Sequence, residues 1–165
     1  MADIWVISDT HFGHDNIIKF CNRPFSDIYD MNETMVERWN SRVKPGDKVY
    51  HLGDVYFGSS QYAWDTLKRL NGKKRLVLGN HDNALGQIER NFFQKVVVWR
   101  RFDDLGLLLT HVPVHPSTLR ENRFKKQMVN VHGHIHTNPS PEGPYRCVCV
   151  EQTDYFPVHI EELKG

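Results

Sequence analysis

In Leu76-Val77-Leu78-Gly79-Asn80-His81-Asp82, a short apolar run changes directly into glycine and three polar residues. The apolar part predicts a strand, and glycine lets the backbone turn sharply at the strand end. The next three side chains offer an amide oxygen, an imidazole and a carboxylate. Asparagine and aspartate are also ordinary turn residues. The role of this stretch therefore depends on which residues stand at the ends of the other strands.

Four further apolar segments also end in polar residues. They are Ile4 to Ser8 before Asp9-Thr10-His11, Lys48 to Leu52 before Gly53-Asp54, Leu107 to Leu109 before Thr110-His111, and Val129 to Val131 before His132-Gly133-His134-Ile135-His136. In open α/β sheets, ligands gather beyond the carboxyl ends of the strands. We therefore expect these polar side chains to meet at one place.

The segments between the strands predict helices in the first half of the chain. Apolar residues recur at helical spacing from Asn32 until Pro45, again after Ser59 or Ser60, and once more from Leu85 to Phe93. Later segments run from strand to strand, including 96–99 and 107–109, which a hairpin-like connection is expected to join, and 145–150. This order predicts an α/β fold with one mixed sheet or two packed sheets and with helices outside.

Length and composition predict one soluble domain. The chain has 165 residues, of which 39% are hydrophobic and 25% charged, so we expect a single domain over residues 1–165. The net charge of +1 provides no global field for nucleic acid or anionic lipid. The basic stretch from Lys68 to Arg75 is interpreted as a solvated face, so nucleic acid is considered only as a substrate. The oligomeric state is not indicated.

The cysteines and the N-terminus favour a cytoplasmic protein. Cys21, Cys147 and Cys149 are an odd number, which favours free thiols in a reducing compartment. Cys147 and Cys149 lack the spacing and the second pair of a zinc site, which argues against a metal role for them. No signal sequence and no apolar run of membrane-spanning length are present.

The polar strand ends carry residues that bind metals. Each residue has a structural explanation when taken alone. An aspartate can cap a helix, an asparagine can form a turn, and a histidine can be buried in a core with its nitrogens hydrogen-bonded. Five strand ends that all bear oxygen or imidazole groups favour a site for two metals over coincidence. Carboxylate, amide and imidazole ligands suit borderline divalent ions better than Ca²⁺.

The five blocks, in order, resemble the signature of the calcineurin-like metallophosphoesterase family. That signature reads Asp-x-His, Gly-Asp, Gly-Asn-His-Asp/Glu, His and Gly-His-x-His, and the chain matches it from residue 9 to residue 136. Ser8 to His14 and the short length are similar to the small single-domain members of bacteria and phages. The resemblance implies a fold of two packed mixed β-sheets flanked by helices.

The resemblance also implies a ligand set for two divalent metal ions. One ion would be held by Asp9, His11 and His136, the other by Asn80, His111 and His134, with Asp54 bridging the two. Manganese is the expected metal, with iron, cobalt, nickel or zinc as alternatives. Two such ions and two carboxylates leave a centre of about +2, which suits a phosphate group.

We therefore predict a phosphoric ester hydrolase. Two metals about 3.5 to 4 Å apart can hold a phosphoryl oxygen and generate a metal-bound hydroxide for in-line attack. Phosphodiesters are the expected substrates in preference to small phosphomonoesters. The alternative is a catalytically silent scaffold of the same fold that binds a protein partner.

Further residues receive roles from the same resemblance. His81 is expected to protonate the leaving oxygen or to stabilise the transition state, with a purely structural histidine as the alternative. The protein-phosphatase branch has Gly-Asp-x-x-Asp-Arg-Gly, but this chain has Phe57 at the second aspartate, which argues against Ser/Thr protein phosphatase activity. Asp82 is a hypothetical replacement that would orient His81. The candidate substrate-binding residues are His14, Arg23 and His115.

Overall fold

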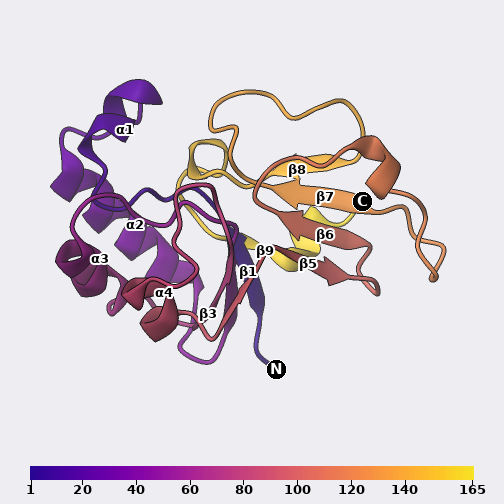
Figure 1. The fold of residues 1–165 in the computed structure, drawn as a ribbon, viewed down its shortest axis with the longest axis horizontal. Helices are drawn as coiled ribbons and strands as arrows, with labels where there is room; N and C mark the ends of the chain where they lie inside the picture. The colour runs from indigo at the N-terminus through magenta and orange to yellow at the C-terminus, as the bar shows by residue number, and fades with distance from the viewer.

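The first half of the chain alternates strands and helices around one sheet, and the computed structural model describes all residues from 1 to 165 (Figure 1). The elements of this half are β1 (Ile4–Ile7), α1 (Asp15–Phe20), α2 (Ile28–Arg42), β2 (Lys48–His51), α3 (Ser60–Leu67), β3 (Lys73–Val77), α4 (Gln87–Phe92) and β4 (Lys95–Val97). The strand order in this sheet is β4-β3-β2-β1-β9, with all pairs parallel except β1 with β9. The carboxyl ends of β1, β2 and β3 therefore share one edge.

The second half of the chain builds a four-stranded sheet with few helical residues. The elements of this half of the chain are β5 (Trp99–Phe102), β6 (Leu107–Thr110), the 3-10 turn η1 (Pro116–Thr118), β7 (Val129–His132), β8 (Tyr145–Cys147), η2 (Val150–Gln152), β9 (Val158–His159) and η3 (Ile160–Leu163). Of these strands, β9 belongs to the first sheet. The order is β5-β6-β7-β8, and only β5 runs antiparallel to its neighbour. Two mixed sheets flanked by helices, the fold class predicted from the sequence, are thus confirmed.

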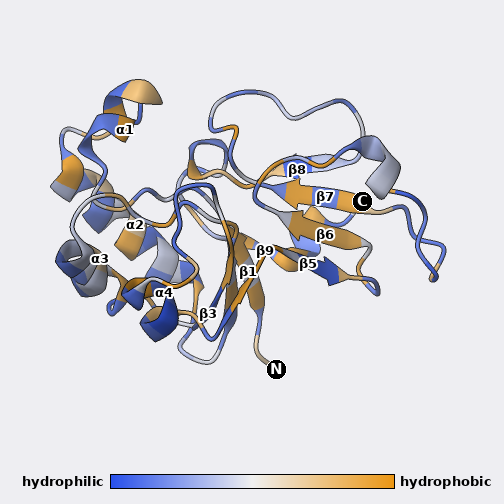
Figure 2. Cartoon of the chain, in the orientation of Figure 1, coloured by the Kyte–Doolittle hydropathy of each residue, from blue (hydrophilic) through white to orange (hydrophobic).

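Two apolar cores hold these layers together. One core fills the space between the sheets, where Val6 and Val77 of the first sheet pack with Leu109 and Val131 of the second. The other core lies between the first sheet and its helices, where Ile7 belongs to the same cluster as Trp39 of α2. Adjacent residues of β1 thus face different cores, which explains why the strand is apolar throughout. Figure 2 shows β1 and β6 as largely hydrophobic, whereas β5 and much of the outer helices are more polar.

Two expectations about elements differ from the structure. The helix expected from Asn32 begins four residues earlier, because Asp27 caps it and accepts a hydrogen bond from the Asp30 N–H at 2.8 Å. The segment 96–99 is not one strand that pairs with 107–109. The chain changes sheets at Val98, so that β4 pairs with β3 whereas β5 forms the hairpin with β6. No helix in the structure has both the length and the apolar character needed to cross a membrane.

Candidate functional site

The predicted site residues come together where the carboxyl ends of strands from both sheets meet. The first sheet contributes Asp9 and His11 after β1, Asp54 after β2 and Asn80 after β3. The second sheet contributes His111 after β6 and His134 and His136 after β7. Six of these seven residues form two groups of potential ligands, and the ligand atoms of each group lie within 4.8 Å of one another.

The first group consists of Asp9, His11 and His136. Asp9 and His11 are buried, and Asp9 Oδ1 lies 3.9 Å from His11 Nε2 and 3.7 Å from His136 Nε2. The other oxygen of Asp9 accepts hydrogen bonds from Ser8 Oγ and from the His134 N–H, at 2.5 and 2.9 Å. Asp9 is thus fixed with one free oxygen between two imidazoles.

The second group consists of Asp54, His111 and His134, with Asn80 beside them. Asn80 Oδ1 lies 2.9 Å from His111 Nε2 and 3.1 Å from His134 Nδ1. Asp54 Oδ2 lies 3.5 Å from His111 Nε2 and 3.6 Å from His11 Nε2. Asp54 therefore connects the second group to the first.

The groups have the chemistry of a divalent metal centre. Asp9 Oδ1 and His11 Nε2 are buried and have no hydrogen-bond partner, which is costly for polar atoms unless a ligand satisfies them. Burial raises the pKa of Asp9, but the His11 imidazole 3.9 Å away and the charge of His111 outweigh it and hold the pKa below its ordinary value. An ionised carboxylate facing imidazole nitrogens is a donor set that fits metal ions.

The backbone is strained at five of these residues. Asp9, His11, Asp54, His134 and His136 all have positive φ, between 49° and 72°. This left-handed conformation is uncommon outside glycine, and sparsely populated conformations cluster at functional sites. The fold thus holds these side chains in place at a conformational cost.

Two glycines allow the loops after β2 and β3 to touch. A Cβ on Gly53, whose φ is +105°, would lie 2.4 Å from the Gly79 nitrogen. A Cβ on Gly79 would lie 2.3 Å from Asp54 Oδ1 and 2.5 Å from the Asp54 nitrogen. Because glycine has no side chain, the two loops can approach this closely, and Asp54 and Asn80 come to lie in adjacent loops.

Glu151 is a site residue that the sequence did not indicate, and Arg23 has a different role from the one predicted. Glu151 Oε1 accepts hydrogen bonds from His136 Nδ1 at 2.7 Å and from Arg23 Nε and Nη2 at 3.1 and 2.8 Å. The remaining Arg23 N–H groups bind the carbonyls of Asp9 and Thr10 and the sulfur of Met31. The structure therefore gives no support to Arg23 as a substrate-binding residue, because its buried guanidinium has no free donor. Glu151 lies 15 residues beyond the last motif and carries no motif of its own.

A further cluster of potential metal ligands consists of Cys21, His136 and Glu151. Burial and then the charge of Glu151 raise the pKa of the Cys21 thiol to about 11. The thiol is therefore protonated near neutral pH in the metal-free protein, and Glu151 of this cluster is already paired with Arg23 and His136. The two groups joined by Asp54 are accordingly the better metal site.

Asp82 accepts hydrogen bonds from backbone N–H groups and not from the His81 side chain. Its Oδ2 accepts hydrogen bonds from the N–H groups of Gly79 and Asp54 at 2.7 and 2.8 Å, and its Oδ1 accepts one from Val55 at 3.1 Å. The hypothesis that Asp82 orients His81 is wrong on this geometry. Asp82 instead fastens the loop after β3 to the loop after β2.

His81 and His14 lie at the open side of the site. The His81 side chain is exposed, and its backbone N–H donates to Asp54 Oδ1 at 3.0 Å. Its ring centroid lies 6.1 Å from that of His11 and 4.8 Å from that of Phe57. His14 stacks on Phe57 at 4.3 Å, and its Nδ1 lies 3.0 Å from His11 Nδ1. Burial and then the charge of His11 lower the pKa of His14 to about 4, so His14 is neutral near pH 7.

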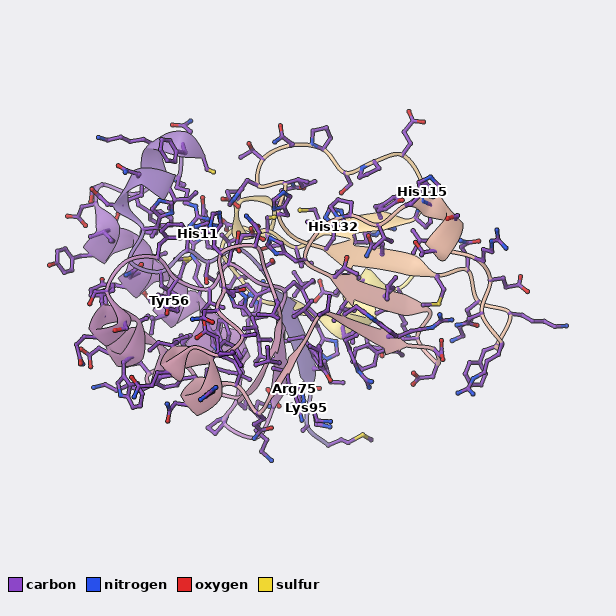
Figure 3. All side chains as sticks on the ribbon, in the orientation of Figure 1. His11, Tyr56, Arg75, Lys95, His115 and His132 are labelled. Atoms are coloured by element: carbon purple, nitrogen blue, oxygen red, sulfur yellow. The ribbon has the colours of Figure 1, made fainter.

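His115 does not join this arrangement. It precedes η1, where its Nδ1 accepts a hydrogen bond from the Ser117 N–H at 3.2 Å. Figure 3 shows His115 at the far end of the second sheet from His11. The structure therefore gives no support to His115 as a substrate-binding residue.

Comparison with known proteins identifies relatives over nearly the whole chain. The sequence model of the calcineurin-like phosphoesterase superfamily domain matches residues 2–148. MJ1445 of Methanocaldococcus jannaschii is 36% identical over 170 residues, which cover 98% of this chain and 89% of that protein. The gene 66 protein of Mycobacterium phage L5 is 28% identical over 165 residues, which cover 83% of this chain and 79% of that protein.

A solved structure has the same overall arrangement. The crystal structure of AQ665, a protein of unknown function from Aquifex aeolicus, superimposes with a TM-score of 0.76 and 28% sequence identity. The superposition covers 99% of this chain and 98% of AQ665. The match in both length and fold places the whole chain, including the segment after residue 148, within one shared architecture.

Proposed function

The chain belongs to the calcineurin-like phosphoesterase superfamily, and from this membership we propose that it is a metal-dependent hydrolase of phosphoric esters. The observation that carries the proposal is the position of Asp54, whose Oδ2 lies 3.6 Å from His11 Nε2 and 3.5 Å from His111 Nε2. A carboxylate that reaches both groups of ligands can hold two ions close together, as two-metal hydrolysis needs. Phosphodiesters are the proposed substrates in preference to small phosphomonoesters.

The two groups would hold two divalent ions, with manganese as the proposed metal. Asp9, His11 and His136 would bind one ion, Asn80, His111 and His134 the other, and Asp54 both. When bound, such ions polarise a phosphoryl oxygen and make a water molecule nucleophilic near neutral pH. The protein's part is to fix the ligands, which the contacts of Asp9 with Ser8 and of His136 with Glu151 accomplish.

His81 is the proposed proton donor to the leaving oxygen. Its backbone N–H is tied to Asp54, so the residue is anchored to the proposed bridging carboxylate while its ring stays exposed. An imidazole at this position can reach an ester held between the ligand groups and transfer a proton. His14, which is neutral near pH 7, is a proposed hydrogen-bonding group at the same opening.

The test compares His81→Ala with wild type in the Mn²⁺-loaded protein, using bis-p-nitrophenyl phosphate as diester and p-nitrophenyl phosphate as monoester. We expect hydrolysis of the diester by wild type and a loss of kcat of about 100-fold or more in His81→Ala, because general acid catalysis contributes on this scale. Bound manganese, measured by elemental analysis, should be unchanged. His115→Ala, an exposed histidine away from the site, is the matched control. Absence of hydrolysis with either ester and fewer than one ion per chain would favour the scaffold instead.

A further inference from the structure

A pocket of about 570 Å³ opens beside the candidate metal centre. It begins at His111 of the second ligand group and at Asn80 beside that group, and it continues over the outer face of the second sheet. Half of its twelve lining residues are hydrophobic. This volume and this mixture of apolar and polar walls are typical of small-molecule sites.

The floor of the pocket is formed by side chains of β5 and β6 that face away from the core. Trp99 lies opposite Thr110, and Arg101 lies opposite Leu108 in the antiparallel register. Opposite residues share a face, and alternate residues such as Leu109 point into the core between the sheets. Trp99 remains 57% exposed and its neighbour Val98 71% exposed, so no other part of the chain covers them.

The floor of the pocket extends from the proposed metal centre along β5. Thr110 directly precedes His111, and Trp99 is its partner, so the indole is the first aromatic surface next to the ligand group. Arg101 lies two residues further along β5, roughly 7 Å beyond Trp99 at the usual strand rise. Its Nε donates to Asp103 Oδ1 at 2.5 Å, and its two Nη groups have no hydrogen-bond partner in the structure. The walls beside this floor are Val112, Val114 and Thr118.

We infer that this pocket binds the nucleoside part of a nucleotide phosphodiester, with the base stacked on Trp99. The inference rests on the proposed function, since the phosphoryl group would lie at Asn80 and His111. An exposed indole suits a planar base, while Thr110, Thr118 and the free Nη groups of Arg101 offer hydrogen bonds to its edge and to the sugar. A purely aliphatic group would make none of these hydrogen bonds.

A binding experiment tests the pocket without any need for turnover. Adenosine 5′-monophosphate and inorganic phosphate are titrated separately into Mn²⁺-loaded wild type, Trp99→Ala and Trp99→Phe, with Kd measured by calorimetry. Trp99→Ala should raise the Kd of adenosine 5′-monophosphate about tenfold, the usual scale of one stacking contact, and Trp99→Phe should restore most of the affinity. The Kd of inorganic phosphate should stay the same. Trp64→Ala, which removes another exposed tryptophan on α3, is the matched control.

A kinetic experiment separates the pocket from the chemistry. Thymidine 5′-p-nitrophenyl phosphate and ethyl p-nitrophenyl phosphate have the same leaving group and differ only in the second ester group. Trp99→Ala should lower kcat/KM for the nucleoside ester about tenfold and that for the ethyl ester less than twofold. If neither ester is hydrolysed by wild type, the proposed function fails while the binding experiment still decides the pocket.

Unchanged binding of adenosine 5′-monophosphate in Trp99→Ala would overturn the inference. So would an equal loss of kcat/KM for both esters, because it would assign Trp99 a general structural role. Sedimentation of the same samples adds one more outcome. If wild type is a dimer that Trp99→Ala dissociates, and nucleotide binding does not involve Trp99, the occupant of this face is a second copy of the chain and the nucleoside assignment is wrong.

Discussion

Glu151 is the residue that decides which nitrogen of His136 is free. Its Oε1 lies 2.7 Å from His136 Nδ1 and is held from the other side by Arg23. A carboxylate at Nδ1 fixes the proton there and leaves the lone pair on Nε2, which faces Asp9. The charge of Glu151 thus acts on the candidate metal centre through one imidazole.

Glu151→Gln should therefore weaken manganese binding. Outer contacts of this type change metal affinity about 10- to 100-fold, and we expect a loss of that size. Isothermal titration of Mn²⁺ into metal-free protein measures the loss, with far-UV circular dichroism as the check on folding. Glu33→Gln removes an exposed carboxylate that pairs with Arg69 and serves as the control. An unchanged Kd would mean that His136 needs no help from Glu151.

Asp82 is a structural carboxylate with a stability effect of its own. Three backbone N–H groups donate to its two oxygens, so Asp82→Asn turns one acceptor into a donor that faces a donor. We expect a loss of about 1 to 3 kcal/mol in the free energy of unfolding, the scale of an unsatisfied buried group. Urea unfolding of the metal-free protein measures it, and Asp104→Asn, an exposed position, is the comparison. A loss of turnover with full stability would instead restore a catalytic role.

His51 makes the metal-free fold sensitive to acid. The Gly53 N–H donates to its Nδ1, and its Nε2 lies 2.9 Å from Thr10 Oγ1, so the ring is neutral and satisfied. Burial lowers its pKa from 6.5 to about 3. Between about pH 3 and pH 6.5 the unfolded chain therefore binds one more proton than the folded protein does. The stability that the neutral ring contributes is complete above pH 6.5 and is lost as the pH falls.

The size of this effect can be measured against a variant that does not titrate. Wild type should lose about 2 kcal/mol more than His51→Asn between about pH 6.5 and pH 4.5, because one pKa unit is worth about 1.36 kcal/mol. The asparagine keeps an acceptor for the Gly53 N–H. Parallel pH profiles of unfolding free energy for the two proteins would show that the buried His51 ring does not cause the loss of stability in acid.

At the scale of elements, the loops after β2 and β3 behave as one unit. Gly79→Ala would place a Cβ 2.3 Å from Asp54 Oδ1 and 2.5 Å from the Asp54 backbone nitrogen, so the loops must separate. We expect a cost of about 1 to 3 kcal/mol in stability and weaker metal binding, because Asp54 and Asn80 move apart. Urea unfolding and manganese titration measure the two effects. Gly46→Ala is the matched control, since a Cβ there meets no atom within 4 Å.

Strand ends could be predicted from the sequence more reliably than strand partners. Each polar block stands directly after an apolar run, and the structure brings the side chains of all seven proposed ligands together where strand ends of the two sheets meet. Val96 to Trp99 is apolar without a break, so nothing local indicates that the chain changes sheets at Val98. That division is decided by pairing with β3 and β6, which lie elsewhere in the chain.

At the scale of the whole molecule, metal binding should join the two sheets. Asp9, Asp54 and Asn80 follow strands of the first sheet, whereas His111, His134 and His136 follow strands of the second. Mn²⁺ should raise the melting temperature relative to the EDTA-treated protein, since a ligand at 100 times its Kd stabilises by about 2.7 kcal/mol. Differential scanning calorimetry measures the rise. His134→Ala should reduce it, and an equal rise in that variant would place the ion elsewhere.

Contacts over long sequence distances are what the sequence could not reveal at this scale. Arg23 and Glu151 are separated by 128 positions, and neither belongs to a motif, yet they meet beneath His136. The pocket beside Asn80 and His111 is formed by side chains from three segments, one of which, Trp99 with Arg101, follows no periodic pattern. Motifs identify groups that do chemistry, but the residues that support them depend on the fold.

The contact between Glu151 and His136 also has a consequence for the order of events on the ribosome. Asp9 is made early, whereas Glu151 and the strand β9, which pairs with β1, are made after all seven proposed ligands. A chain cut short before Glu151 would carry those ligands but lack the carboxylate that sets His136, and one edge of β1 would be unpaired. Complete metal loading is accordingly expected only once the segment with Glu151 and β9 has emerged and packed.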